Sequence, residues 1–180
     1  MRVKLKRRYN ATGRRAQAAR TRDAVLEAAE RLFLADGYAA TTVASIAAAA
    51  GVSAETIYKA FRGKPGLVAA IRELRLAGAG PIHAERRSDA ERAEESDPRK
   101  LVAKWGELTA EVAPLVSPIL LLVRDAATTD PEMAGLHAKL DADRRRRMTV
   151  NATHLRDAGS LRSGVTLREA VDMLWVFSSP

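Results

Sequence analysis

Cysteine is absent from the 180 residues of this chain, and aromatic residues make up only 4% of it. A chain without cysteine forms no disulfide, holds no thiolate-bound metal and has no thiol nucleophile. Long apolar runs are also missing, since the longest, Ile119 to Val123, is far too short to span a bilayer. The basic residues near the N-terminus precede no apolar stretch, unlike those of a secretory signal. We therefore expect a soluble, cytoplasmic protein with no membrane partner.

Alanine, leucine and arginine are abundant, and hydrophobic residues make up 47% of the chain. These three residues are good helix formers, whereas strands favour β-branched and aromatic residues. Apolar residues recur at helical spacing through most of the sequence, and no strand pattern or internal repeat competes with them. The sequence therefore predicts an all-α fold.

Proline and glycine divide this helical pattern. Residues 77–99 are charged and contain several glycines and prolines, which is typical of a linker with at most one short helix. The helical pattern returns at Pro98, and we expect a short break between Pro114 and Pro118. We expect three segments: a flexible basic arm (1–13), a first helical domain (14–76) and a second helical domain (77–180).

Positive charge is concentrated in the first third of the chain. Residues 1–62 contain 12 Lys and Arg against 5 Asp and Glu, whereas residues 63–180 contain 18 against 17. Such an imbalance is typical of a region that meets a polyanion such as nucleic acid, but a solubilising surface has the same composition. Charge alone leaves both interpretations open.

The segment from Thr41 to Phe61, TTVASIAAAAGVSAETIYKAF, predicts two short helices joined by a tight turn. Thr42 and Ser53 are suited to cap these helices, and Gly51 permits the sharp turn between them. Its alanines allow two helix backbones to cross closely, as in a helix-turn-helix whose second helix lies in the DNA major groove. A tight helical hairpin inside a core would show the same spacing. The residues we expect to face outward from the second helix are Ala54, Glu55, Thr56, Tyr58, Lys59 and Ala60.

The stretch RDAVLEAAERLFLADGYAATTVASIAAAAGVSAETIYKAFRGKPGLVAAI resembles the DNA-binding domain of TetR-type transcriptional regulators, over about residues 18–74. The elements that carry the resemblance include Gly37-Tyr38, Thr41-Thr42-Val43, Ala50-Gly51-Val52-Ser53, Thr56-Ile57-Tyr58, Phe61 and Lys64. Ala60 and the pair Pro65-Gly66 depart from the residues that are usual in the family. The remainder of the chain is similar, more weakly, to the ligand-binding domain of one branch of these regulators.

The resemblance implies a set of residues at the DNA interface. Thr42 and Thr56 would contact phosphates, Tyr58 and Lys59 would reach bases or phosphates, and Lys64 would touch the DNA backbone. Ser53 and Glu55 lie on the same short helix or at its start. Arg14 and Arg15, together with Arg7 and Arg8, are candidates for an arm that enters the minor groove, although a disordered basic tail is the alternative.

The resemblance also implies a helical second domain with an effector cavity and a dimer interface. We expect the cavity to be mostly apolar, although the same apolar stripes are typical of core packing. The candidate ligand-binding residues are Trp105, Leu108, Val112, Leu122, Met133, His137 and Met148. The candidate dimerisation residues are Leu167, Val171, Leu174 and Trp175, on a final helix that begins with a capping box of Thr166 and Glu169. The chain ends within this helix, and we expect it to be truncated there.

Other kinds of site find little support. His83, His137 and His154 are isolated from carboxylate partners at ligand spacing, so we predict no metal and no cofactor. No phosphate-binding loop, nucleophile elbow or paired carboxylates occur, which argues against an enzyme. The four arginines from Arg144 to Arg147 spread around a helical turn, and we expect them on a solvated surface with some paired to Asp141 and Asp143.

The sequence therefore predicts a ligand-responsive repressor that binds double-stranded DNA. A homodimer would place two recognition helices in successive major grooves of a pseudo-palindromic operator, and a small apolar effector would release it. The alternative is a sequence-nonspecific nucleoid or scaffold protein, which would bind all duplexes equally and with a steep dependence on salt.

Overall fold

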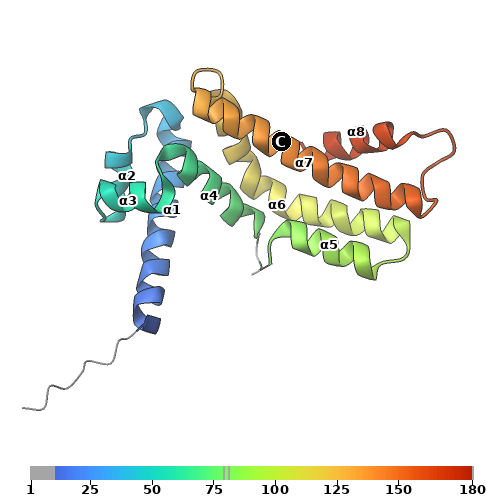
Figure 1. The fold of residues 1–180 in the computed structure, drawn as a ribbon, viewed down its shortest axis with the longest axis horizontal. Helices are drawn as coiled ribbons and strands as arrows, with labels where there is room; N and C mark the ends of the chain where they lie inside the picture. The colour runs from blue at the N-terminus through green and yellow to red at the C-terminus, as the bar shows by residue number, and fades with distance from the viewer. Residues whose placement is uncertain (1–10, 79, 81, 180) are drawn as a thin grey trace, which may run out of the picture.

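The computed structural model describes residues 11–78, 80 and 82–179, and this part of the chain folds into eight α-helices without a strand (Figure 1). The predicted all-α fold class is confirmed. The helices are α1 (Ala11–Ala40), α2 (Val43–Ala50), α3 (Ala54–Phe61), α4 (Lys64–Leu76), α5 (Ala84–Glu94), α6 (Pro98–Ala126), α7 (Pro131–Asp157) and α8 (Leu167–Phe177).

The helices form two groups along the long axis of the molecule. Helices α1 to α4 gather at one end, and α5 to α8 extend from it (Figure 1). In the second group the long helices α6 and α7 pack side by side, with α5 against α6 and α8 against α7. Helices α1 and α4 also pack against α6, so the two groups are in direct packing contact.

Side-chain caps determine where several helices begin. The Thr42 hydroxyl accepts a hydrogen bond from the Ser45 main-chain N–H, and the Ser45 hydroxyl accepts from the Thr42 N–H, which makes a capping box at the start of α2. The box that the sequence predicts from Thr166 and Glu169 is present at the start of α8. Asp130 caps α7 with its carboxylate, which accepts hydrogen bonds from the Glu132 and Met133 N–H groups. These local signals are strong because each one satisfies main-chain N–H groups that the helix leaves unpaired.

The predicted break between Pro114 and Pro118 is wrong, because α6 runs through both prolines as one helix. A proline inside a helix removes a main-chain hydrogen bond and usually kinks or breaks the helix. In α6 a buried stripe continues on both sides of the prolines and packs into the bundle, which offsets the loss. This stripe consists of Leu101, Trp105, Val112, Val116, Ile119, Val123 and Ala126.

The region 77–99 contains one short helix, as the sequence prediction allowed, since α5 occupies 11 of its residues. Ala84 and Ser88 are buried, and the Arg87 guanidinium donates two hydrogen bonds of 2.8 and 3.0 Å to the Glu111 carboxylate on α6. Helix α5 has almost no apolar stripe, and its attachment depends on such polar contacts. Apolar periodicity therefore could not reveal how closely it packs.

Helix α1 begins at Ala11, three residues before the predicted start, and so takes in residues of the predicted basic arm. The rest of that arm, including Arg7 and Arg8, lies outside the described residues. The predicted stop at Gly37 is present as a local interruption with φ 82° and ψ 164°, after which the chain makes another short helical stretch to Ala40. Only glycine adopts this backbone conformation without strain.

One apolar core joins the two groups of helices. Phe33 of α1, Ile57 of α3 and Leu67 of α4 are fully buried in the same cluster as Ile119 and Val123 of α6. A partly buried ion pair reinforces the first group, because the Arg75 guanidinium on α4 donates two hydrogen bonds to the Glu30 carboxylate on α1. The hydrogen bond to Glu30 raises the pKa of Arg75, and partial burial of the guanidinium opposes this effect without cancelling it.

Helix α6 is the one helix among the described residues that is long and apolar enough, by length and composition alone, to cross a membrane. This is weak evidence for a membrane segment, because core helices of soluble proteins meet the same criterion. In this structure α6 packs against α1, α4, α5 and α7.

Candidate functional site

Helices α2 and α3 form a compact pair around the turn at Gly51. Gly51 has φ 67° and ψ 32°, and its N–H bonds back to the carbonyls of α2, so it ends that helix in the left-handed conformation. The Ser53 hydroxyl then accepts from the Thr56 N–H at 3.2 Å and starts α3. Ile46, Ala47, Ile57 and Phe61 are buried, and Ala50 and Val52 pack against the same core. The pair therefore has the predicted helix-turn-helix geometry.

The outer face of α3 is exposed to solvent. Glu55, Thr56, Tyr58, Lys59 and Ala60 are exposed, with 56% of Tyr58 accessible. Ala54 differs from the prediction, because it is half-buried and packs against the core. This face offers a hydroxyl, a phenol and an ammonium within two helical turns, and such groups contact phosphates and base edges in the major groove.

Three hydroxyls at the helix starts form short local networks. Thr42 and Ser53 are exposed N-caps, so they lie at the positive ends of α2 and α3. The Ser53 and Thr56 hydroxyl oxygens are 2.9 Å apart, within hydrogen-bond distance of each other. These hydroxyls satisfy the helix starts and still face outward, and helix N-termini favour anions such as phosphate.

Lys64 lies at the first residue of α4 and is half-buried. Its ammonium donates a 2.7 Å hydrogen bond to the main-chain carbonyl of Tyr38 and sits 4.1 Å from the centroid of the Tyr38 ring. Burial, and then the charges of Asp130 and Glu132 at the start of α7, raise the pKa of the Tyr38 phenol well above its usual range. Tyr38 thus ties α4 to the loop between α6 and α7.

Gly66 is held by close packing that the sequence did not reveal. A Cβ at this position would lie 1.7 Å from the Phe61 carbonyl oxygen. The start of α4 therefore approaches the end of α3 so closely that only glycine fits. Between them Arg62 adopts φ 64°, which is unusual for a residue with a side chain. In the departure Pro65-Gly66 noted in the sequence, the glycine is thus a steric requirement of this turn.

Arg14 and Arg15 lie in the first turns of α1, and both are exposed. They belong to a regular helix and not to an irregular arm. Further along α1 the Arg22 guanidinium stacks on the Phe61 ring, 4.8 Å from its centroid, and so supports the end of α3.

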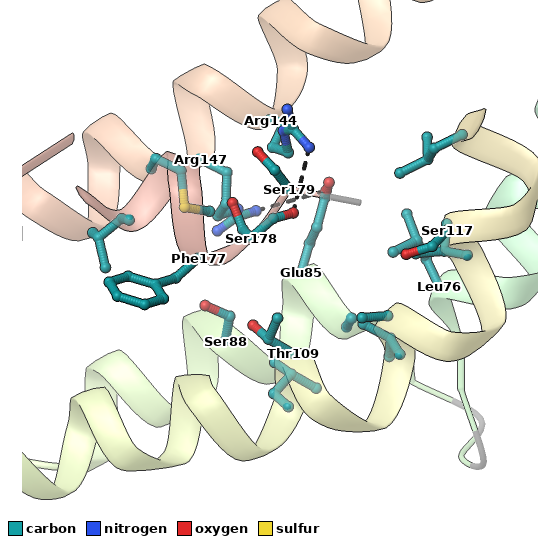
Figure 2. Close-up of a pocket in the computed structure, with 18 of the residues that line it drawn as sticks. Leu76, Glu85, Ser88, Thr109, Ser117, Arg144, Arg147, Phe177, Ser178 and Ser179 are labelled. Carbon is teal, nitrogen blue, oxygen red and sulfur yellow. Dashed lines mark hydrogen bonds and ion pairs between the residues drawn. The ribbon is translucent and has the colours of Figure 1, made fainter. Parts of the chain in front are cut away.

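A cavity of about 870 Å³ opens among α4, α5, α6, α7 and the end of α8 (Figure 2). Its walls are mostly apolar and come largely from α6, and the volume suits a small organic molecule. Five of the seven candidate ligand-binding residues line it: Trp105, Leu108, Val112, His137 and Met148.

The other two candidates lie elsewhere. Met133 is fully buried in the core that joins the two groups of helices, and Leu122 packs against the same core. Both were chosen from apolar spacing, which does not distinguish a core wall from a cavity wall. Both therefore belong to the core that α6 and α7 share with the helix pair α2 and α3.

The prediction that Arg144 to Arg147 form a solvated surface is wrong for two of them. Arg144 and Arg147 line the cavity and are only 19% and 22% exposed in their side chains. Arg145 and Arg146 are exposed, as predicted. The expected pairing is confirmed, because Arg146 bonds to Asp143 and Arg144 lies 3.6 Å from Asp141. The missing signal was tertiary, since α8 covers one side of Arg144.

The candidate dimerisation residues mostly face inward. Val171 is buried against α7, with Leu167 and Leu174 packed on the same cluster. Trp175 is half-buried and carries the Arg144 guanidinium 3.7 Å above its ring. The exposed apolar residues of α8 are Met173, Val176 and Phe177, at 59%, 67% and 76%.

No group of three or more His, Asp and Glu side chains that could hold a metal occurs in the described part of the chain. His137 approaches a single carboxylate, with its Nε2 3.8 Å from the Asp141 Oδ2.

Comparison with known proteins finds a family match for the first group of helices and a likeness in fold for most of the chain. Residues 25–71 match the family model described as bacterial regulatory proteins, tetR family. No curated protein sequence matches the chain significantly.

Among solved structures, PfmR from Thermus thermophilus, a TetR family transcriptional regulator, has a TM-score of 0.61 at 24% identity, over 87% of this chain and 84% of that one. SmeT, solved as a complex with triclosan, has a TM-score of 0.68 at 24% identity, over 87% and 75%. FadR, a fatty acid degradation regulator from Bacillus halodurans, has a TM-score of 0.68 at 16% identity, over 88% and 82%. These likenesses show a shared fold across most of the chain.

Proposed function

We propose that the chain is a TetR family transcriptional repressor that binds a pseudo-palindromic operator as a homodimer and is released by a small, mostly apolar effector. TetR family regulators are not enzymes, in keeping with the absence of catalytic motifs noted in the sequence. A cytoplasmic location follows from this function.

The main support for operator binding is the exposed face of α3, where Thr56, Tyr58 and Lys59 project from a helix held rigidly by core residues. We propose that these side chains, with the outward hydroxyls of Thr42 and Ser53, contact the DNA. Glu55 would discriminate between bases by accepting a hydrogen bond from a base amino group. Lys64, Arg14 and Arg15 would contact the DNA backbone.

The support for release by an effector is the cavity together with the core that connects it to α3. Val123 lines the cavity and is fully buried in the core that contains Ile57. An effector that favours one arrangement of α6 therefore also acts on the DNA-binding helices, and linkage makes effector and operator binding mutually dependent. The likeness in fold to a triclosan complex supports an aromatic or apolar ligand.

The support for a homodimer is the exposed apolar face of α8. Met173, Val176 and Phe177 project from it, and side chains of this kind mark interaction surfaces when they cluster. Two copies would place their α3 helices about 34–36 Å apart, one turn of DNA.

The operator is tested by selecting duplexes from a randomised pool with the full chain and sequencing the bound fraction. We expect an enriched pseudo-palindrome. Recovery of the input distribution, with equal affinity for all duplexes and a steep salt dependence, would instead establish the nucleoid alternative.

The dimer is tested by sedimentation of the parent chain and of Phe177→Asp. We expect the substitution to shift the chain from dimer to monomer, because a charge on the contact face loses its hydration on association. Leu34→Asp, at another exposed apolar position on α1, serves as the control and should leave the dimer intact.

A further inference from the structure

Three buried nitrogen atoms without an acceptor belong to residues that line the cavity. They are Arg72 Nε on α4, Trp105 Nε1 on α6 and Arg144 Nε on α7. All three are N–H donors, and no buried oxygen of a described lining side chain lacks a partner. The cavity wall is therefore short of acceptors and not of donors. A ligand that supplies acceptors would complement it.

Arginines also outnumber carboxylates among the charged side chains that line the cavity. Four arginines and two carboxylates, those of Glu85 and Asp141, line the cavity. Two of the arginines are neutralised away from it, since Arg72 pairs with Glu73, and Arg124 is 60% exposed next to Asp125. The remaining two arginines, Arg144 and Arg147, are balanced in number by Glu85 and Asp141, so the preference of the cavity for a charged ligand depends on how closely each arginine is paired.

Arg147 is well compensated. It donates a hydrogen bond to Asp89 and lies 3.7 Å from a Glu85 carboxylate oxygen (Figure 2). Burial opposes ionisation of Asp89, but the contacts with Arg147 and Arg92 outweigh it and lower the pKa of this carboxyl group. Both carboxylates come from α5, so Arg147 serves mainly to hold α5 against α7.

Arg144 is the least compensated cation of the four. Its nearest carboxylate, Asp141, is 3.6 Å away, which is longer than a hydrogen bond. Among the described residues its guanidinium donates a hydrogen bond of 3.3 Å to the Ser178 carbonyl (Figure 2). The guanidinium also lies on the Trp175 ring. Burial lowers the pKa of Arg144, and Asp141 only partly opposes this. A guanidinium has five N–H donors, so most of its capacity is unused.

We propose that the effector is an amphipathic organic anion whose anionic head group binds the Arg144 guanidinium and whose apolar body lies along α6. This assignment rests on the proposed function, in which the cavity holds the effector. The apolar body would contact Leu108, Val112 and Val116, which line the cavity on α6. Arginine binds carboxylates and other planar or tetrahedral oxyanions more effectively than a lone charge would, because its N–H groups form a fixed fork.

The same contact connects the effector to α8. Arg144 holds the Trp175 ring and the Ser178 carbonyl, both at the end of that helix. A head group that draws the guanidinium into the cavity weakens these two contacts. Helix α8, which bears the exposed apolar face, would then respond to the charge of the effector and not only to its volume.

The test uses two fluorescent dyes with the same apolar body. 8-Anilinonaphthalene-1-sulfonate carries an anionic group, and N-phenyl-1-naphthylamine lacks it. Both are titrated into the full-length parent chain, into Arg144→Met and into the matched control Arg146→Met, an exposed arginine on the same helix. Loss of hydrogen bonds to a charged group should weaken binding of the anionic dye by roughly 10- to 100-fold in Arg144→Met. The neutral dye should change by less than about threefold, and Arg146→Met should change neither.

Equal effects of Arg144→Met on the two dyes, or no effect on either, would overturn the anionic head group while leaving the cavity as an effector site. If neither dye binds the parent chain, the proposed effector site fails as well. Thermal melting checks that each variant folds. Arg144→Gln, which removes the charge but keeps a polar end, is the second neutral variant and should show the same selective loss.

Discussion

The Lys64 ammonium is hydrogen-bonded to the Tyr38 carbonyl and stacked on the ring of the same residue. A residue that the sequence assigned to the DNA backbone is thus also an internal brace between α4 and the end of α1. The two roles are compatible, because an ammonium has three N–H donors and the Tyr38 carbonyl takes one. The brace also orients whatever contact Lys64 makes outside the protein.

Lys64→Ala should therefore weaken both folding and DNA binding. We expect a loss of about 1–2 kcal/mol in the free energy of unfolding, from the charge-assisted hydrogen bond and the cation–π contact. The slope of operator affinity against salt should fall by about one if the ammonium meets a phosphate. Urea unfolding and fluorescence anisotropy at several salt concentrations measure the two effects. Tyr58→Phe is the matched variant, since Tyr58 is exposed and should lose DNA affinity alone.

Gly66→Ala should destabilise the chain by about 3 kcal/mol, at the upper end of overpacking costs. The new methyl group would overlap the Phe61 carbonyl oxygen, which is main chain and cannot rotate away. Gly135→Ala is the control, because its added Cβ meets nothing within 4 Å on α7. That control should gain about 1 kcal/mol from helix propensity. Chemical denaturation measures the free energy of unfolding of both variants. If Gly66→Ala were as stable as the parent chain, α4 would have to move freely away from α3.

Gly51→Val should cost roughly 2 kcal/mol or more, because a β-branched residue is strained at φ 67°. Space is not the limit, since a Cβ there would meet nothing within 4 Å. Gly51→Asn should cost much less, because asparagine tolerates the left-handed conformation. A higher melting temperature for Gly51→Val than for Gly51→Asn would refute the explanation from backbone strain.

Asp89→Asn should weaken the attachment of α5 to α7 in a way that depends on pH. Burial opposes ionisation of Asp89, but Arg147 and Arg92 outweigh it and lower the folded-state pKa below the ordinary value of 3.8. The stabilisation is therefore complete above the pKa of the unfolded chain and is lost as the pH falls through the folded-state value. Because the side chain is 44% exposed, we expect a difference below about 1 kcal/mol.

Denaturation from pH 7 down to pH 3 measures this effect. The stability difference between parent and Asp89→Asn should be constant down to about pH 5 and should shrink below about pH 4. Asp125→Asn is the control, since its carboxylate is 75% exposed and contacts the neighbouring Arg124. A difference between parent and Asp89→Asn that grows towards low pH would contradict the assigned sign.

Local chemistry made much of this fold predictable. Thr42, Gly51, Ser53 and Thr166 each act on main-chain groups within a few residues, so the ends of α2, α3 and α8 could be read from neighbouring letters. The helix-turn-helix followed from the same signals. Its exposed face was predictable for the same reason, since helical periodicity places Tyr58 and Lys59 away from the buried face of Ile57.

Contacts between distant segments were not predictable from the sequence. The prolines of α6 suggested a break, and the packing of Val112, Val116 and Ile119 overrides it. The position of Arg144 depends on Trp175, a residue 31 positions later on another helix. Leu122 was predicted to line the cavity but packs against the core. The reason is related, because the apolar stripe of a helix does not show which neighbouring helix it will contact.

The core that holds Phe33 and Ile57 together with Ile119 and Val123 has a consequence for how the protein melts. Helices α1 to α4 share this core with α6 and α7, so we expect α3 and the cavity walls to unfold as one cooperative unit. Heating should give a single calorimetric peak. Any molecule that occupies the cavity raises the melting temperature of α3 as well, in proportion to the logarithm of its concentration over its dissociation constant. Thermal shift alone can therefore screen for effectors before the operator is known.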